Sequence, residues 1–188
     1  MVTSCAPYKS GVDQTAAQNY FNDQMLNRIK DLEYFIWFHD AKYDPNNQNV
    51  ENWPTVPFIL TIFCTIDCLG GIVCGFRENR LQNGQCKVRG NSVPRFTHVC
   101  QNLMGCTEAE ANFLYRAARN GFVHGGFGEM LAVVDPVNEL QDNGRFLAHH
   151  ENDGKILVYL KDLARRVIRA IEHVRDNGPD FASSTSLS

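Results

Sequence analysis

Two arginines, an asparagine and a histidine lie close together in residues 107–126, TEAEANFLYRAARNGFVHGG. At about 100° per residue, Arg116, Arg119, Asn120 and His124 share one side of a helix, opposite an apolar side. Arginine grips phosphate oxygens with a bidentate fork, and histidine, with a reference pKa of about 6.5, exchanges protons near neutral pH. Such a cluster suits attack on a phosphodiester by its own 2′-hydroxyl, which requires no metal and no cofactor.

The helix that must carry these side chains has a recognisable start and end. Thr107 and Glu110 have the spacing of a capping box, in which the hydroxyl and the carboxylate bind each other's backbone N–H. The pair Gly125-Gly126 should end the helix. Its apolar side includes Tyr115, a candidate for binding substrate beside Arg116, and three small residues that permit close packing. These small residues are Ala117, Ala118 and Gly121.

The segment RNGFVH, from Arg119 to His124, resembles the Arg-x4-6-His motif, with a polar residue after the arginine, of the HEPN superfamily (higher eukaryotes and prokaryotes nucleotide-binding). HEPN proteins are small helical bundles, and many are metal-independent endoribonucleases that dimerise so that two motifs face each other. The resemblance implies that Arg119 and His124 are catalytic and that Asn120 orients or binds the phosphate. It also implies an RNA or nucleotide ligand, a homodimer and a protein antitoxin as partner, within a toxin or defence system.

Two other interpretations of the same residues stay open. The chain would be a non-catalytic module if Arg119 and His124 hold a nucleotide or a protein partner without chemistry. It would be a structural subunit if they pair with buried carboxylates. Solvent access separates these interpretations, because a site needs the Arg119 and His124 side of the helix open to a cleft or a dimer groove.

Composition places limits on the class of protein. The chain has 188 residues, of which 44% are hydrophobic and 21% charged, which is enough for one well-buried domain. Its seven cysteines, odd in number and mostly in apolar runs, indicate reduced thiols. The first ten residues lack the pattern of a signal peptide, so we expect a cytoplasmic protein with no membrane partner.

Charge is uneven along the chain although the net charge is only −3. Residues 77–95 contain five basic residues and one acidic residue, a local charge of +4. Residues 129–154 contain six acidic residues and one basic residue, a local charge of −5. The first segment predicts a basic loop that offers a polyanion a local patch, but solvated loops of opposite sign would give the same pattern.

Apolar residues recur at threes and fours over residues 13–43, which predicts an amphipathic helix. Residues 56–76 are apolar almost all round and just long enough to span a bilayer. Because Asp67 at their centre would be costly in lipid, they predict a buried central helix instead. Buried there, Asp67 must be paired or protonated, and we expect it to support the site by bonding Arg119, Arg116 or His124.

The remaining segments complete a mainly α fold, a HEPN-like bundle of four or five helices with a small β-hairpin insertion. Residues 93–103 should form a short helix and, with residues 107–126, an αα-hairpin. Residues 130–134, 145–149 and 155–158 are β-prone, and Asn152-Asp153-Gly154 predicts a hairpin turn. Residues 159–175 predict a last helix with a basic face. We therefore expect a disordered segment 1–12, one domain over 13–178, and a flexible tail 179–188.

Overall fold

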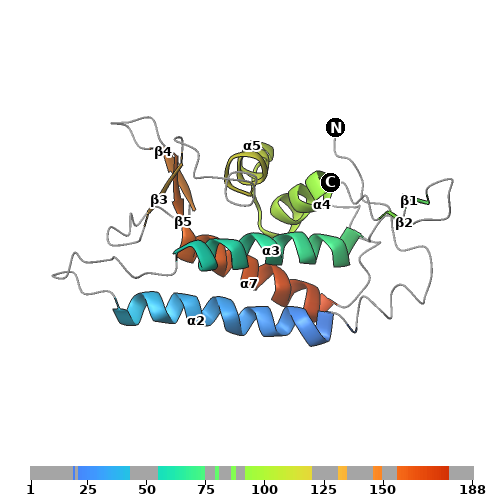
Figure 1. The fold of residues 1–188 in the computed structure, drawn as a ribbon, viewed down its shortest axis with the longest axis horizontal. Coiled ribbons are helices and arrows are strands. Elements are labelled where there is room, and N and C mark those ends of the chain that lie inside the picture. The colour runs from blue at the N-terminus through green and yellow to red at the C-terminus, as the bar shows by residue number, and fades with distance from the viewer. Residues whose placement is uncertain are drawn as a thin grey trace.

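The structure is a computed structural model that describes residues 19, 21–42, 55–74, 79–80, 86–87, 92–119, 131–134, 146–149 and 156–177 (Figure 1). These residues include the backbone of the motif helix from Thr107 to Arg119. Asn120 and His124 lie outside the described residues, as does the side chain of Arg119. The predicted terminal segments 1–12 and 179–188 also lie outside them.

The described part of the chain is mainly α-helical, as predicted. Its helical elements are η1 (Phe21–Met25), α2 (Leu26–Lys42), α3 (Thr55–Cys74), α4 (Ser92–His98), η2 (Val99–Leu103), α5 (Glu108–Phe113), η3 (Leu114–Arg119) and α7 (Leu160–Asn177). The three η elements are π-helical turns, which contain one more residue per hydrogen-bonded ring than an α-helix. Each adjoins an α-helix, so the described elements form five helical segments.

Helix α3 lies at the centre of the packing, against α2, α4 and α7 (Figure 1). The predicted central helix is confirmed, but it is buried on one side only: Val56, Pro57 and Cys64, on the opposite side, are exposed. Its buried side chains face α2, α4 and α7. They include Phe58, Ile59, Ile62, Phe63, Ile66, Leu69 and Ile72. Among the described helices, α3 alone is long and apolar enough to cross a membrane, over Val56–Val73, and 61% of that stretch is buried inside the protein. Burial of this extent is typical of a core helix.

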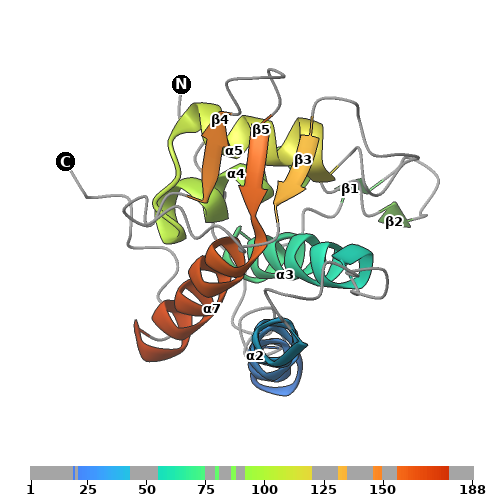
Figure 2. The ribbon, with the colours of Figure 1, turned by 90° about the vertical axis from the view of Figure 1, so that its left-hand side faces the viewer.

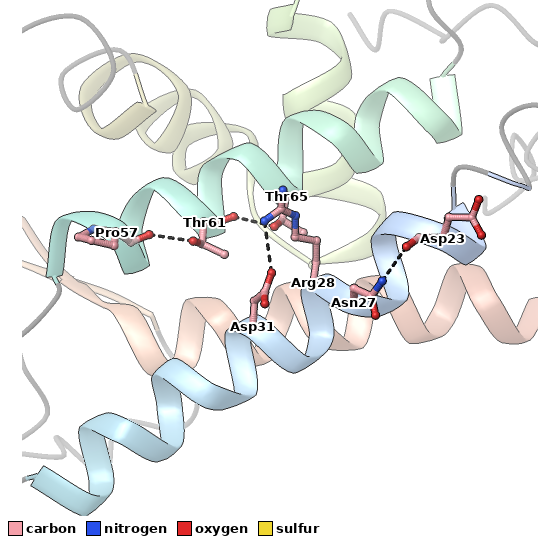
Figure 3. Close-up of polar contacts among 7 residues, drawn as sticks. All are labelled: Asp23, Asn27, Arg28, Asp31, Pro57, Thr61 and Thr65. Atoms are coloured by element: carbon pink, nitrogen blue, oxygen red, sulfur yellow. Dashed lines mark hydrogen bonds and ion pairs between the residues drawn. The ribbon is translucent and has the colours of Figure 1, made fainter.

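Helix α2 covers one side of α3. Met25 and Leu32 are buried, and Ile29 and Ile36 are half-buried, so the predicted apolar stripe is confirmed over the described part of this helix. A polar strip, which includes Arg28 and Asp31, lies beside this apolar stripe. Arg28 forms an ion pair of 3.3 Å with Asp31 and points from α2 toward α3 (Figure 3).

On the α3 side of this strip, two threonine hydroxyls bond to carbonyls within their own helix. Thr65 donates to the carbonyl of Thr61 at 2.6 Å, and Thr61 donates to that of Pro57 at 2.8 Å (Figure 3). This bonding lets Thr65 be fully buried, because a hydroxyl without a partner would be costly in the core.

A three-stranded sheet lies beside the helices (Figure 2). Strands β4 (Leu147–His149) and β5 (Ile156–Tyr159) pair antiparallel, which confirms the predicted hairpin. Strand β3 (Leu131–Val134) pairs parallel to β5, so the strand order is β3-β5-β4. The hairpin is therefore extended by a third strand, whose place the sequence pattern did not predict.

Two further segments differ in part from the sequence predictions. The predicted basic loop contains a pair of two-residue antiparallel strands, β1 (Asn79–Arg80) and β2 (Cys86–Lys87). Helix α7 begins at Leu160, because Tyr159 still belongs to strand β5, and its predicted apolar stripe is buried. The buried members of that stripe are Leu160, Leu163, Val167, Ile171 and Val174, while its remaining member, Ile168, is half-buried.

Candidate functional site

The motif helix begins with the predicted capping box. The backbone N–H of Thr107 donates to Oε2 of Glu110 at 2.7 Å, and the N–H of Glu110 donates to Oγ1 of Thr107 at 3.3 Å. The Thr107 hydroxyl also donates to Oε2 of Glu110 at 2.9 Å. These bonds satisfy backbone donors that the first turn of a helix leaves open, so they fix where α5 begins.

The turn before this helix is held from two directions. Gly105 has a φ of 68°, a left-handed conformation that glycine adopts without strain, and the N–H of Cys106 donates to the carbonyl of Cys100 at 2.9 Å. From helix α7, Nη1 of Arg166 donates to the carbonyl of Met104 at 2.8 Å. The Arg166 guanidinium also lies 4.7 Å from the ring centre of Phe146, next to strand β4. The turn is thus tied to α7 and the sheet.

The apolar side of the motif helix faces the core. Ala111 and Leu114 are fully buried, and Tyr115 packs edge-on against Phe96 of α4, with ring centres 5.4 Å apart. Because only 8% of Tyr115 is exposed, its ring packs the η3 part of the motif helix against α4 in this structure. Its predicted role in binding substrate stays a prediction.

The polar side of the same helix carries Arg116, which is exposed. Arg119 is the last residue of η3, and both arginines belong to this π-helical turn. A π turn has more residues per turn than an α-helix, whereas the predicted alignment of the site residues assumed the α-helical repeat. The alignment of Arg119, Asn120 and His124 with Arg116 stays a prediction, because the Arg119 side chain, Asn120 and His124 lie outside the described residues.

Asp67 lies on α3 and is half-buried rather than fully buried. Its carboxylate is near Cys100 of η2, and its negative charge helps to raise the pKa of that thiol, after burial and the neighbouring Cys106. Asp67 is thus close to the turn that precedes the motif helix. The predicted bond from Asp67 to Arg116, Arg119 or His124 stays a prediction.

A histidine and an asparagine that the sequence analysis missed form a pair next to the motif helix. Nδ2 of Asn102 is 3.1 Å from Nδ1 of His98 and also donates to the His98 carbonyl at 3.0 Å. Burial lowers the pKa of His98, which favours its neutral form. The only sequence signal is the His-x3-Asn spacing, which recurs on α7 as His173 and Asn177, also 3.1 Å apart.

The basic face predicted for the last helix is only partly available to a ligand. Arg166 turns inward, as described above, whereas Arg165 and Arg169 are exposed. Arg165 pairs with Asp162 at 3.2 Å, and Nε of Arg169 donates to the Arg165 carbonyl at 3.4 Å. Within the described ranges, no group of three histidine, cysteine, aspartate or glutamate side chains is placed to hold a metal ion.

No protein-family model, curated protein or solved structure matches this chain. The likeness to HEPN proteins therefore rests on the six residues Arg119 to His124 and on the helical context that precedes them.

Proposed function

We propose that this protein is a metal-independent endoribonuclease of HEPN type that cleaves RNA by attack of the 2′-hydroxyl on the adjacent phosphodiester. The observation that carries the proposal is the placement of the motif helix. Its start is fixed by the Thr107–Glu110 capping box and its apolar side is packed on α4, while Arg116 remains exposed. An anchored helix with an open cationic side is the arrangement that a phosphate site requires.

In the proposed reaction, His124 takes or gives the proton and Arg119 stabilises the charge that builds on the phosphorane. Asn120 orients the phosphate or the imidazole, and Arg116 binds a neighbouring phosphate. Transphosphorylation moves two protons, one from the attacking hydroxyl and one to the leaving oxygen. One histidine supplies one proton carrier, so a homodimer that joins two motifs in one groove would supply the second.

The proposal includes the setting of the reaction. We place the protein in the cytoplasm, in agreement with the free thiols of the four described cysteines Cys64, Cys68, Cys100 and Cys106. A protein antitoxin that covers the exposed side of the motif helix would be its regulator.

The test is incubation of the purified protein with a mixed RNA pool in excess EDTA. Cleavage should persist and leave 2′,3′-cyclic phosphate ends, because the attacking group belongs to the substrate. His124→Ala and Arg119→Ala should each lower single-turnover cleavage by about 100-fold or more. Arg119→Lys should not restore full activity, because an ammonium lacks the planar fork of a guanidinium.

Matched controls are available near the end of α7, where His173 and Arg175 are both exposed. Arg175→Ala and His173→Ala remove the same side-chain types from another helix, so they should leave cleavage unchanged. Binding of RNA without cleavage would establish the non-catalytic module instead. If neither activity appears, and the Arg119 and His124 variants lose several degrees of melting temperature, both residues are structural.

A further inference from the structure

Two thiols meet at the turn between η2 and α5. Cys100 lies in η2 and is fully buried, and Cys106 directly precedes the N-cap residue Thr107 and is 6% exposed. The Cys106 side chain is close enough to Cys100 to contribute to the raised pKa of its thiol. Their main chains are also joined, because the N–H of Cys106 donates to the Cys100 carbonyl at 2.9 Å.

This geometry is close to what a disulfide needs. A disulfide requires Cα atoms about 4.4–6.8 Å apart and side chains directed at each other. The backbone bond holds the two residues side by side, the left-handed Gly105 lets the chain reverse between them, and both side chains are buried within the same turn. We propose that Cys100 and Cys106 form a reversible disulfide that locks the turn before the motif helix under oxidising conditions.

The oxidant is a small peroxide, and the reaction balances with no other reagent. The Cys106 thiol, as the more exposed of the two, attacks one peroxide oxygen, which gives a sulfenic acid and one water molecule. The Cys100 thiol then attacks the Cys106 sulfur, so that the S–S bond forms and a second water molecule leaves. Both thiol protons end in water, and the two sulfur atoms are oxidised as the peroxide is reduced. A dithiol reductant reverses the step by exchange.

The surroundings make this disulfide slow to form at neutral pH. Burial, the neighbouring Cys106 and the charge of Asp67 together raise the pKa of Cys100 well above its ordinary value. Since the thiolate is the attacking species, oxidation should accelerate as pH rises. Asp67→Asn removes one source of negative charge near Cys100, so it should accelerate disulfide formation without adding a new thiol.

The experiment is mass spectrometry of the whole folded protein after treatment with hydrogen peroxide and alkylation of the remaining thiols. Trypsin places Cys100 and Cys106 on one peptide, Phe96 to Arg116, because no lysine or arginine lies between them. That peptide should become two hydrogens lighter, should carry no alkyl group, and should regain two alkylatable thiols after dithiothreitol. The melting temperature of the oxidised protein should rise by several degrees, since the crosslink restrains the unfolded chain.

Cys64 and Cys68 supply the internal control, because they lie on α3, on a different tryptic peptide, and Cys64 is exposed. At the peroxide dose that crosslinks Cys100 and Cys106, their peptide should show no loss of two hydrogens, whether or not the exposed Cys64 has gained oxygen. The Cys106→Ala variant should lose the crosslink. The proposal is overturned if the Phe96 to Arg116 peptide keeps two free thiols, carries sulfinic acids, or becomes linked to another chain.

Discussion

The two sides of α3 differ in how closely the neighbouring main chain approaches. Toward α2, Phe58 stacks on Phe35 with ring centres 5.2 Å apart, so large side chains fill the space between the helices. Toward α4, Phe63 lies beside Phe96 with ring centres 6.1 Å apart, and the main chains also come close at Gly70, where an added Cβ would lie 2.8 Å from the carbonyl oxygen of Arg95. Both sides therefore depend on large rings, and the α4 side depends in addition on the missing side chain of Gly70.

This difference bears on the candidate site. Helix α4 continues into η2, and the turn at Gly105 then leads into the motif helix. The close approach at Gly70 thus helps to set where the motif helix lies, whereas the Phe35–Phe58 contact mainly holds α2. Substitutions on the two sides should have different costs and different consequences for the site.

The largest expected effect is on the α2 side. Phe58→Ala should lower the free energy of unfolding by about 3–5 kcal/mol, because it removes a fully buried ring and leaves a cavity. Urea denaturation measures this change in the free energy of unfolding. Trp37→Ala, on the 61% exposed outer face of α2, is the matched aromatic control and should change stability by less than about 0.5 kcal/mol. Equal losses in both variants would show that α2 is held by its outer face as well.

The next effect is on the α4 side. Gly70→Ala should cost about 1–3 kcal/mol, because the new methyl group meets the Arg95 main chain, which cannot move aside as a flexible side chain would. Cys64→Ala, at an exposed position of the same helix, should be nearly neutral. If Gly70→Ala instead stabilises by about 1 kcal/mol, as helix propensity alone predicts, α4 does not approach α3 this closely.

A smaller effect is expected at the start of the motif helix. Thr107→Ala removes the hydroxyl of the capping box and should cost about 1 kcal/mol, while Thr107→Ser, which retains the hydroxyl, should cost much less. Amide hydrogen exchange over residues 108–111 should accelerate in the alanine variant, because the first turn loses its cap. An unchanged exchange rate there would mean that packing on α4, and not the cap, fixes the start of the helix.

The smallest expected effect is the pH dependence of the α4–η2 segment. Burial lowers the pKa of His98 in the folded state, so the unfolded chain binds a proton more readily. Stability should therefore decrease as pH falls below the unfolded value of about 6.5, until the folded pKa is passed. Melting temperatures over this range should show a weaker pH dependence for His98→Gln than for the wild type.

Asn102→Ala separates burial from hydrogen bonding as the cause of this shift. It removes the amide bonded to His98 but leaves His98 within the protein, so the pH dependence of the melting temperature should persist. If the dependence disappears in this variant, the amide and not burial controls the protonation of His98.

The sequence by itself determined the features that depend on neighbours a few residues away. The capping box joins residues three positions apart, the β4–β5 hairpin follows from alternation around a turn signal, and the all-round apolar character of α3 required burial. The break between η2 and α5 followed in the same way from Met104-Gly105. In each case the relevant hydrogen bonds or periodicity lie within one short stretch.

The tertiary structure alone decided the features that depend on distant partners. Arg166 points inward because its guanidinium donates to the Met104 carbonyl, 62 residues away in sequence, and lies over the Phe146 ring. The parallel pairing of β3 with β5 likewise joins distant segments. The same is true of the close approach of Gly70 to the main chain of Arg95 in α4. The π-helical backbone of η3 was likewise not predictable from the sequence, because the preferred 3.6-residue repeat gives way where packing demands another geometry. A helical wheel drawn from sequence assumes that repeat throughout, so it located the motif helix but not this change in its backbone.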